Sequence, residues 1–561
     1  MDATNRLVAG VLAEISDLLE IHGENPFKVR AYARAAEVVG HLGRSVAGMN
    51  EDELEALPGI GKAIAEKVRE IAETGTCREQ ARLREATPQG LPALLNLQGV
   101  GPKTVRRLWK ELGVVGLDDL EAAARAHRIR ALRGFREKKE HEILRAVGVA
   151  RRGTDRMSLT EAEHLADVML AAIPGEAWVA GSLRRGRSTI GDIDIVTLAP
   201  VRETAHSLAR VADEVIDAGE KKISIRISGR RADVRFAAPK DLGAMLLYLT
   251  GSKAFNIRLR EVARIPGMRL NEYGLTDHKT GELRQFRTED EVFAALGMSP
   301  VPPELREDRG EVDLALEGNI PPLVDVQEIR GDLHVHSEWS DGTMSLEEIA
   351  AAGEERGYEY MLVSDHSASL GIAHGLDAPR LARQQVAIEQ VNRTSGCTLL
   401  AGVEVDILAD GKLSLPDESL QNCDLVIASV HSAFGQDEDV MTRRVITAIE
   451  KRDVDIIGHP TGRLIGRRPP VAIDMERVIR AAAENETALE INASPGRLDL
   501  DDIYIKQAQE RGVRLAIGTD AHAAPELAYL RHGVALARRG WCGPGDILNT
   551  RSLADLLERR G

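Results

Sequence analysis

Residues 181–195 read GSLRRGRSTIGDIDI and combine residue types that bind phosphate with residue types that bind metal ions. The glycines and Ser182 predict a turn whose amides and hydroxyl hold phosphate oxygens, with two arginines beside it. Asp192 and Asp194 are two positions apart along a predicted strand, so their side chains point to one face. Two carboxylates this close repel each other unless a cation lies between them, and a hard ion such as Mg²⁺ is the natural occupant.

The residues around this stretch predict a mixed α/β subdomain with a third carboxylate. Asp233 lies in another predicted strand, Ala232–Phe236. An isolated pair of strand aspartates is most often a solvated sheet edge, but the GSLRRG sequence ahead of the pair and Asp233 behind it favour a metal site. The other expected elements are strands at Trp178–Ala180, Ile193–Leu198 and Ile223–Ile227, and helices at 159–172 and 203–218.

This pattern resembles the nucleotidyltransferase superfamily, in which two metal ions position a hydroxyl for attack on a nucleotide α-phosphate. The segments Tyr248–Ser252 and Leu270–Tyr273, together with Asn256 and Arg260, narrow the resemblance to family X DNA polymerases of the polymerase beta type. The resemblance extends over about residues 5–300 and includes two glycine hairpins that precede the aspartates.

The resemblance implies a role for each of these residues. Asp192 and Asp194 would bind both metal ions, Mg²⁺ or Mn²⁺, and Asp233 would complete the catalytic site and help to deprotonate the primer 3′-hydroxyl. Leu249 stands where the family has an aromatic residue beside the sugar. The incoming nucleotide would be bound by Ser182, Arg185, Gly191, Arg156, Tyr248, Gly251, Asn256 and Arg260.

The two glycine hairpins are the internal repeat that the sequence suggests. Residues 57–62 read LPGIGK and residues 97–103 read LQGVGPK, and predicted helices follow at 63–73 and 104–112. Such a turn points backbone N–H groups and a helix N-terminus at a phosphate. One copy could be an ordinary turn between packed helices, but two copies with matched flanks predict helix-hairpin-helix motifs that grip the DNA backbone. The expected contacts are Gly59, Gly61, Lys62, Gly99, Gly101 and Lys103.

In family X the small N-terminal domain binds the 5′-phosphate of a gap, and the resemblance places Lys28 and Tyr32 at that site. In animal members this domain also removes deoxyribose phosphate through a lysine Schiff base, and Lys67 matches the position of the nucleophile. A Schiff base requires a neutral amine. An equal alternative is that Lys67 only contacts DNA or solvent.

Seven of the 15 histidines lie in short motifs at predicted strand ends after residue 330. A single histidine at a strand end is usually a satisfied polar residue. Two HxH or DxH pairs together with five further candidate ligands at strand ends predict instead a centre of two or three metal ions. Imidazole and carboxylate ligands suit Zn²⁺, Mn²⁺ or Fe²⁺. The expected ligands are His334, His336, Asp341, His366, His374, Glu404, His431, His459, Asp520 and His522.

The order of these motifs resembles the polymerase and histidinol phosphatase (PHP) domain, a distorted (βα)7 barrel, over about residues 329–545. The resemblance implies hydrolysis of phosphoesters, with Glu404 as a bridging ligand. Short apolar strands that alternate with helical patterns agree with a parallel barrel. The expected strands are Tyr360–Val363, Leu399–Val405, Leu425–Val430, Val454–Ile457, Ala488–Ile491 and Arg514–Ile517.

The 561 residues therefore predict a multidomain α+β and α/β protein. Helical helix-hairpin-helix domains would be followed by a nucleotidyltransferase palm with a thumb, and then by the PHP barrel. The expected boundaries are 1–90 for the small helical domain with the first hairpin, 91–148 for the second hairpin subdomain, 149–240 for the palm, 241–297 for the thumb-like nascent-base-pair subdomain, 298–328 for a linker and 329–561 for the PHP domain.

The net charge of −15 is unevenly distributed: residues 1–300 carry 46 basic and 43 acidic side chains, and the rest carries 27 and 45. Four scattered cysteines without a CxxC spacing argue against a disulfide framework or a thiolate zinc site. Apolar runs are far shorter than the roughly 18 residues of a membrane span, and a signal sequence is not indicated. We expect a soluble, cytoplasmic monomer.

Together these features predict a DNA polymerase that fills short gaps during DNA repair, with gapped or nicked DNA and dNTPs as partners. The C-terminal site would hydrolyse DNA 3′ ends as a 3′–5′ exonuclease, with abasic-site endonuclease or 3′-phosphatase activity as further candidates. One alternative is a small-molecule phosphatase that uses only the barrel; the hairpins and the GSLRRG turn argue against it. The other is a non-catalytic DNA-binding scaffold, and the three aspartates argue against that.

Overall fold

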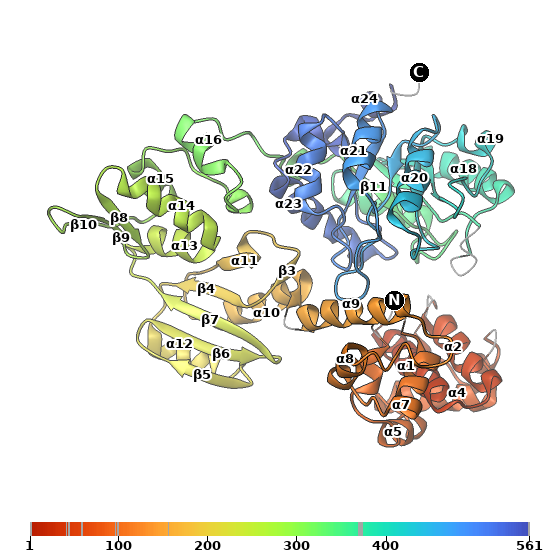
Figure 1. The fold of residues 1–561 in the computed structure, drawn as a ribbon. Helices are drawn as coiled ribbons and strands as arrows, with labels where there is room; N and C mark the ends of the chain where they lie inside the picture. The colour runs from red at the N-terminus through yellow and green to blue at the C-terminus, as the bar shows by residue number, and fades with distance from the viewer. Residues whose placement is uncertain are drawn as a thin grey trace. The chain divides into compact units, whose positions relative to one another are not determined.

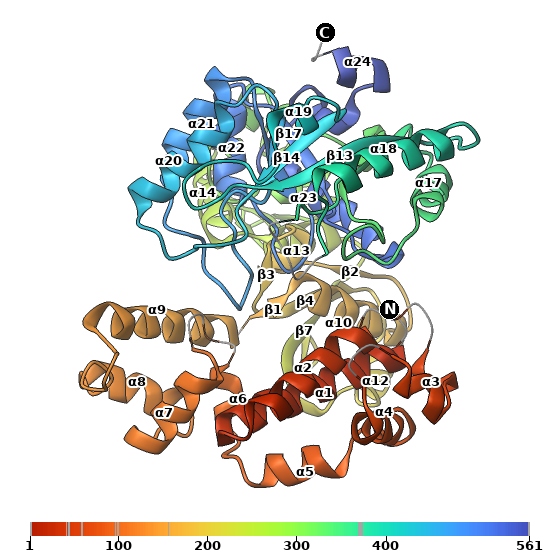
Figure 2. The same ribbon diagram turned by 90° about the vertical axis from the view of Figure 1, so that its right-hand side faces the viewer.

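The structure, a computed structural model, describes residues 3–40, 42, 45–57, 60–95, 97, 100–154, 156–368 and 374–558 (Figures 1 and 2). Two of the expected DNA contacts, Gly59 and Gly99, lie outside these residues. The chain forms two compact units, of which one holds residues 1–154 and the other nearly all of the remainder. The predicted fold class, helical domains followed by a palm with a thumb and a parallel barrel, is confirmed.

The described part of the first unit is helical. In α1 (Ala3–His22), Leu12, Ile15 and Leu19 recur at helical spacing and are fully buried, which gives the unit its central helix. Helix α1 packs against α2 (Pro26–Gly40). The other helices are η1 (Val46–Gly48), α3 (Glu51–Glu55), α4 (Lys62–Thr74), α5 (Arg78–Glu85), α6 (Leu91–Leu94), α7 (Pro102–Leu112), α8 (Leu117–Arg125) and α9 (Glu137–Thr154).

Helices α4 and α7, which follow the two glycine hairpins, begin and end in the same way. Gly61 (φ −92°, ψ 171°) precedes α4, and Gly101 (φ −80°, ψ 173°) precedes α7. Both helices are followed by a left-handed glycine, Gly75 (φ 78°) and Gly113 (φ 73°). Glycine adopts this conformation without the steric cost of a Cβ atom. The matched ends agree with the internal repeat seen in the sequence.

The palm is a five-stranded sheet in the order β2-β4-β7-β6-β5. Strand β4 runs parallel to β7, and the other neighbouring pairs are antiparallel. The helices α10 (Leu159–Ala172), α11 (Gly181–Arg184) and α12 (Val201–Leu208) accompany it. The strands are β2 (Ala177–Val179), β4 (Ile193–Thr197), β5 (Glu214–Ala218), β6 (Lys222–Ile227) and β7 (Arg230–Phe236), and a separate pair is formed by β1 (Met157–Ser158) and β3 (Thr189–Ile190).

The helix predicted at 203–218 is wrong in its second half. Helix α12 ends at Leu208, and residues 214–218 form the edge strand β5, which pairs antiparallel with β6. All five residues of β5 are exposed, so burial imposes no alternating apolar pattern on them. Pairing with β6 therefore decides the conformation, and a local pattern does not reveal it.

The thumb follows the palm and continues into the segment predicted as a linker. Within residues 298–328, Val301, Leu305 and Val312 are buried in the same cluster as Phe255 and Phe293 of the thumb. The connection is therefore ordered and packed. The elements are α13 (Leu242–Thr250), α14 (Lys253–Arg264), β8 (Met268–Asn271), β9 (Gly274–Asp277), β10 (Leu283–Arg284), α15 (Glu289–Ala295), η2 (Pro303–Leu305), α16 (Glu311–Glu317) and η3 (Val326–Glu328).

The C-terminal domain is a sheet of seven parallel strands in sequence order, from β11 to β17. A bridge between Val335 and Ala521 joins the two edges, so the sheet nearly closes into a barrel. Because helices cover its outer face, the strands are largely apolar. The strands are β11 (Gly331–Val335), β12 (Tyr360–Val363), β13 (Thr398–Asp406), β14 (Leu425–Ser429), β15 (Ile456–Ile457), β16 (Ala488–Asn492) and β17 (Leu515–Gly518).

The barrel helices alternate with these strands, as the sequence predicts. In the part of the chain that the structure describes, none is long and apolar enough to cross a membrane. The helices are α17 (Leu346–Glu355), α18 (Ala378–Asn392), α19 (Asp417–Leu420), α20 (Glu438–Ile449), α21 (Met475–Glu484), α22 (Asp502–Glu510), η5 (Ala524–Tyr529), α23 (Leu530–Arg539), η6 (Pro544–Asp546), η7 (Leu548–Thr550) and α24 (Leu553–Leu557).

Candidate active sites

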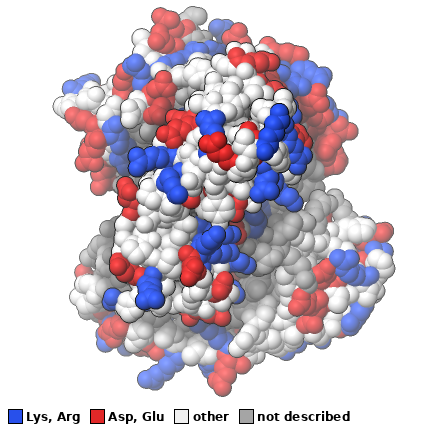
Figure 3. Space-filling model, turned by 90° about the vertical axis from the view of Figure 1, so that its left-hand side faces the viewer, with Lys and Arg blue, Asp and Glu red and all other residues white. Residues whose placement is uncertain are grey.

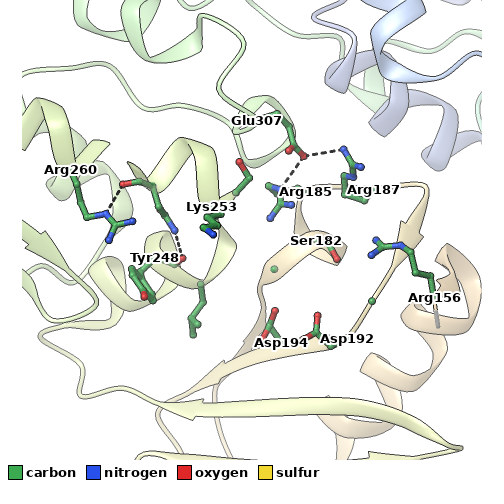
Figure 4. Close-up of a pocket in the computed structure, with 16 residues that line it drawn as sticks. Arg156, Ser182, Arg185, Arg187, Asp192, Asp194, Tyr248, Lys253, Arg260 and Glu307 are labelled. Atoms are coloured by element: carbon green, nitrogen blue, oxygen red, sulfur yellow. Dashed lines mark hydrogen bonds and ion pairs between the residues drawn. The ribbon is translucent and has the colours of Figure 1, made fainter. Parts of the chain in front are cut away.

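The palm strands β4 and β7 bring the predicted carboxylates together. Asp194 lies opposite Asp233 in the parallel register, and Asp192 directly precedes β4. One oxygen from each of the three side chains lies within 4.8 Å of the others. Asp192 and Asp194 point into the same pocket (Figure 4), as expected for alternate positions along an extended chain. Their role as metal ligands stays a prediction.

The electrostatics of this cluster fit a bound cation. Burial, followed by repulsion from Asp192 and Asp233, raises the pKa of Asp194 to about 7. Burial also acts to raise the pKa of Asp233, but hydrogen bonds, first of all from the Lys222 ammonium 2.6 Å away, lower it overall. The Oδ1 atom of Asp233 is buried and has no hydrogen-bond partner among the described residues. Mg²⁺ or Mn²⁺ between the three carboxylates would relieve the repulsion.

The turn at Gly181 allows Asp194 to approach the phosphate-binding segment. Gly181 has φ +63°, and a Cβ atom added there would lie only 2.3 Å from the Oδ2 atom of Asp194. Only glycine meets both requirements, because other residues rarely adopt this φ and all carry a Cβ atom. The same turn begins α11, so Ser182 is held directly beside the carboxylates.

A pocket of about 690 Å³ opens above the carboxylates and is lined by all eight residues predicted to bind the nucleotide (Figure 4). Tyr248 and Asn256 come from the thumb side, where the Asn256 amide donates to the Tyr248 carbonyl over 2.7 Å and the Arg260 Nε donates to the Asn256 carbonyl over 3.1 Å. On the palm side, Arg156 Nε donates to the Thr189 hydroxyl over 2.8 Å. The eight residues are Ser182, Arg185, Gly191, Arg156, Tyr248, Gly251, Asn256 and Arg260.

Two charged residues of this pocket were missed from the sequence, Arg187 and Glu307. The Glu307 carboxylate accepts a hydrogen bond of 3.1 Å from Arg185 Nε and lies 3.7 Å from Arg187 Nη1 (Figure 4). Arg187 directly follows the GSLRRG sequence, so its position was a usable signal. Glu307 lies in the segment predicted as a linker, and nothing in its local sequence connects it to Arg185.

Surface charge on the face shown in Figure 3 does not form a patch of a single sign. Figure 3 shows acidic and basic side chains intermixed over one face of the molecule. This agrees with the near balance of 46 basic and 43 acidic side chains in residues 1–300. We therefore locate DNA contacts from particular backbone and side-chain positions, because phosphate binding depends on local geometry as well as net charge.

The described hairpin residues leave room for a phosphate. No atom lies within 4 Å of the position of a Cβ atom at Gly61 or Gly101 in the described structure. Lys62 is exposed at the start of α4, and Lys103, in α7, is 88% exposed. The free N–H groups of a helix N-terminus favour an anion at such a position.

The residues expected to hold a 5′-phosphate lie in the first unit, in different environments. The Lys28 ammonium donates to the Glu79 carboxylate over 2.9 Å. Tyr32 is nearly buried, and burial, with the nearby Glu79 charge, raises its pKa to about 12. Lys67 lies 3.6 Å from the Glu70 carboxylate. A Schiff-base nucleophile must be a neutral amine, and the lyase role of Lys67 stays a prediction.

Glu404, on β13, is the centre of the histidine cluster in the barrel. Its carboxylate lies 2.7 Å from His366 Nδ1, 3.3 Å from His431 Nε2 and 3.0 Å from His459 Nε2. Burial acts to raise the pKa of Glu404, but the neighbouring imidazoles lower it well below its usual value. Three groups of ligand atoms each lie within 4.8 Å: His336 with Asp341, His366 and His522; His334 with His336 and Asp520; and His366 with Glu404 and His431.

Two further carboxylates contact the Nδ1 atoms of two candidate ligand histidines. Glu490 Oε1 lies 2.6 Å from His334 Nδ1, and Asp406 Oδ1 lies 2.5 Å from His431 Nδ1. The buried Nε2 atom of His431 has no hydrogen-bond partner in the described structure and faces Glu404. A ring held by a carboxylate, with its other nitrogen left for a metal ion, is typical of metal-binding histidine. The chemistry of these residues therefore fits Zn²⁺, Mn²⁺ or Fe²⁺.

Sequence reasoning missed Glu490 and Asp406, although a signal existed for each. Asp406 follows Glu404 by two positions on β13 and so points to the same side. Glu490 is an acidic residue inside the apolar strand β16, and it is buried. A buried acid in an apolar strand needs a partner, which here is a histidine.

One predicted ligand, His374, is not brought to the cluster. Among the residues that the structure describes, no group of candidate ligand atoms includes it, and it is exposed. It directly follows residues 369–373, which lie outside the described ranges. Its role as a ligand stays a prediction.

Family models match four parts of the chain. The model described as a helix-hairpin-helix domain matches residues 3–77, and a SAM-like helix-hairpin-helix tandem matches residues 91–148. The DNA polymerase beta thumb model matches residues 245–307, which extends past the predicted thumb boundary and includes Glu307. The PHP domain model matches residues 332–494. These matches confirm the helix-hairpin-helix, thumb and PHP domain types, while the exact boundaries stay predictions.

Similar proteins cover the chain to different extents. The "DNA polymerase/3′-5′ exonuclease PolX" of Bacillus subtilis is 39% identical over 559 residues, which are 97% of each chain. The DNA polymerase lambda of Rattus norvegicus is 26% identical over 309 residues, or 48% of this chain and 51% of the relative. A probable phosphatase of Caldanaerobacter subterraneus is 34% identical over 216 residues, or 36% of this chain and 81% of the relative. The chain therefore belongs to family X of the DNA polymerases, in the branch that carries a C-terminal PHP domain.

Proposed function

We propose that this protein fills short gaps in DNA by nucleotidyl transfer in the palm and hydrolyses DNA 3′ ends in the barrel. The observation that carries the proposal is the pocket of about 690 Å³ in which Asp192, Asp194 and predicted phosphate-binding residues meet. The Bacillus subtilis relative, which is similar over 97% of the chain, is named for both activities. The repair setting and the choice of gapped or nicked DNA are part of the proposal.

In the polymerase site, Ser182 and Arg185 would bind the triphosphate of a dNTP, and Tyr248 would lie by its sugar. Held by the three aspartates, Mg²⁺ or Mn²⁺ would supply the charge neutralisation that nucleotidyl transfer needs. Asp233 would accept the proton of the primer 3′-hydroxyl, since its Oδ1 atom has no hydrogen-bond partner in the described structure.

In the barrel, Glu404 and the eight other predicted ligands that cluster with it would hold two or three Zn²⁺, Mn²⁺ or Fe²⁺ ions. These ions would supply an activated water and neutralise the phosphodiester charge. Asp406 and Glu490 would fix the orientation of His431 and His334 through their Nδ1 atoms. The expected reaction is 3′–5′ exonucleolysis, and abasic-site cleavage and removal of a 3′-phosphate are further candidates.

The helical unit would hold the DNA. Gly61, Lys62, Gly101 and Lys103 would contact phosphates without reading the base sequence, and Lys28 would contact the 5′-phosphate of the gap. We expect the protein to act as a monomer in the cytoplasm. Binding should weaken steeply as salt is added, because phosphate contacts release bound counterions.

The test uses a 5′-labelled primer on a 5′-phosphorylated one-nucleotide gap, with Mg²⁺ or Mn²⁺, with and without dNTPs. We expect Asp194→Ala to lose extension and keep primer shortening, and His336→Ala to show the reverse. Loss of both activities in either variant would contradict two separate sites. A wild-type protein that neither extends nor shortens the primer would contradict the proposed function.

A phosphatase that uses only the barrel is the second candidate, because several relatives named as probable phosphatases match mainly this domain. Two substrates assayed side by side, a DNA primer with a 3′-phosphate and the small ester p-nitrophenyl phosphate, would distinguish a DNA hydrolase from a small-molecule phosphatase. Faster hydrolysis of the small ester than of DNA would favour the phosphatase.

The lyase proposal for Lys67 is tested by trapping. A gapped DNA with a 5′-deoxyribose phosphate is incubated with the protein and reduced with borohydride, which fixes a Schiff base to the lysine. We expect a cross-link that Lys67→Ala removes and that Lys62→Ala, at the start of the same helix, retains. A cross-link that survives Lys67→Ala would refute the assignment.

A further inference from the structure

Helix α23 of the PHP domain reaches the phosphate-binding turn of the polymerase site. Arg539, at the C-terminal end of this helix, is 2% exposed although it carries a guanidinium group. Its Nη1 atom donates to the carbonyl of Arg185 over 2.7 Å. Its Nη2 atom donates to Glu307 over 3.1 Å and to Asp502 over 2.5 Å. Its Nη1 atom also donates to the carbonyl of Glu304 over 3.5 Å. A buried arginine with four acceptors is well satisfied and has a fixed orientation.

Glu307 links Arg539 to the nucleotide pocket. Its Oε1 atom accepts from Arg539 and also from Arg185, the residue assigned to the triphosphate, while Arg187 lies 3.7 Å away. Burial acts to raise the pKa of Glu307, but the three arginines lower it overall, so the carboxylate stays ionised. One carboxylate oxygen therefore orients Arg185 from the pocket side and Arg539 from the barrel side.

The network has a net positive charge that can attract a nucleotide. Arg185, Arg187 and Arg539 surround Glu307, and Arg309 lies 3.0 Å from Asp502, which also binds Arg539. Four cations thus face two carboxylates. When Arg185 binds a triphosphate as well, Glu307 still has Arg539 and Arg187 as partners and is not left as an uncompensated buried charge.

The backbone of the turn is also packed against the barrel helix. A Cβ atom at Gly186, which has φ +65°, would lie 3.6 Å from the Ala535 Cβ and 3.7 Å from the Arg539 Cδ. Leu183, in α11, packs against the buried clusters of both the palm and the barrel. The phosphate-binding turn is therefore supported from behind by α23.

We propose that Arg539 is a positioning residue of the polymerase site: together with Glu307 it holds Arg185 and its turn in the orientation that receives the triphosphate. This deepens the proposed function and rests on it. The PHP domain would thus complete the nucleotide pocket structurally, in addition to its own chemistry. Arg539 would not touch the nucleotide.

The test compares Arg539→Met with Arg538→Met in the full-length protein. Arg538 is the neighbouring residue on the same helix and also joins the barrel to the preceding segment, through Glu304 (2.7 Å) and the Val324 carbonyl (3.0 Å), but no contact described for it involves Arg185. We expect Arg539→Met to raise the KM for dNTP about tenfold, with kcat changed less than about twofold, because an oriented charged hydrogen bond is lost. Arg538→Met should leave both constants near the wild-type values.

Two further measurements separate positioning from a general loss of structure. Equilibrium binding of a non-hydrolysable dNTP and of the matching dNMP should show a lower preference for the triphosphate in Arg539→Met, since Arg185 acts on the phosphates. Hydrolysis of a single-stranded 3′ end by the barrel should be unchanged. An unchanged preference and KM, or equal effects of Arg538→Met and Arg539→Met, would overturn the proposal.

If Arg539→Met does not fold, Asp502→Asn replaces it. This isosteric change lies in the barrel helix α22 and weakens the second anchor of Arg539. We then expect a KM increase of about threefold at constant kcat, and an unchanged KM would refute the proposal. The binding assay needs no turnover, so a wild-type protein that binds dNTP without extending a primer would contradict the proposed function and leave the positioning role testable.

Discussion

Gly181 combines a left-handed backbone with the close approach of Asp194, so its substitution tests the geometry of the carboxylate cluster. A Cβ atom in Gly181→Ala would lie 2.3 Å from Asp194 Oδ2 and must displace that carboxylate. We expect the rate of nucleotide insertion in single-turnover primer extension to fall about a hundredfold, because small shifts of reacting groups are costly. Hydrolysis by the barrel should be retained.

Gly229 provides the matched control for this substitution. It has φ +74°, close to that of Gly181, but no atom in the described structure lies within 4 Å of its Cβ position. Gly229→Ala therefore introduces the backbone strain without the contact. Equal losses in the two variants would assign the effect to strain and not to displacement of Asp194.

Glu79 would compete with the proposed 5′-phosphate of the DNA for Lys28. Hydrogen bonds from Arg82 and Lys28 lower the pKa of Glu79 to about 2, so the carboxylate stays charged throughout the working pH range. We expect Glu79→Gln to tighten binding of 5′-phosphorylated gapped DNA about threefold, the size of an exposed ion pair, with little change between pH 6 and 9. Fluorescence anisotropy with and without the 5′-phosphate measures this, and equal tightening for both DNAs would contradict a role of Lys28 at the phosphate.

At the scale of elements, an ion network joins α11 to the thumb. Glu289, in the first turn of α15, accepts from Arg184 of α11 over 2.6 Å and from the buried Arg306 over 2.6 Å. Glu289→Gln replaces the carboxylate shared by the buried Arg306 and the half-buried Arg184 with a neutral amide. We expect local opening of α15, measured by native-state hydrogen exchange, to become easier by about 3 kcal/mol. Asp290→Asn removes an exposed charge from the same turn and should cost less than about 1 kcal/mol.

The contribution of Glu289 to the stability of the fold should decrease as the pH falls. Burial acts to raise its pKa, but Arg306 and Arg184 lower it overall in the folded protein. A depressed carboxyl pKa stabilises the fold fully above the unfolded pKa of about 4.3, and this stabilisation is lost as the pH falls through the folded pKa. The difference between wild type and Glu289→Gln should therefore be constant near neutral pH and shrink below about pH 4. A difference that grows on acidification would contradict the ion-pair explanation.

At the scale of the whole molecule, removal of metal ions should affect the two units differently. The candidate ligands around Glu404 are assembled only in the folded barrel, so bound ions stabilise it by mass action, by about 2.7 kcal/mol at a hundredfold excess over the dissociation constant. We expect chelation to lower the unfolding temperature of the barrel and Mn²⁺ to restore it, while hydrogen exchange in residues 3–154 is unchanged. His336→Ala should show a smaller shift, and equal shifts in both proteins would place the stabilising ion elsewhere.

The strands of the barrel were largely predictable because their sequences are locally consistent. Runs such as Tyr360–Val363 are buried on both faces and therefore apolar throughout, and this run matches β12 at both ends. Residues 214–218 were not predictable in this way, because β5 is exposed and its pairing with β6 is not visible in a local pattern. Patterns in a single sequence reflect which residues are buried. An exposed edge strand has no alternating apolar pattern, so it is hard to recognise from the sequence.

The sequence by itself determined which residues gather at both candidate sites: the three aspartates, the eight residues predicted to bind the nucleotide and nine of the ten predicted barrel ligands are brought together as the motifs predict. Motif residues are close in sequence or follow a strand period, so their spacing carries the information. Only the tertiary structure revealed Glu307 and Arg539, which contact Arg185 from distant elements. It also revealed the histidine partners of Asp406 and Glu490. Their contacts depend on how helices and strands pack, and a buried charge finds its partner through space and not along the chain.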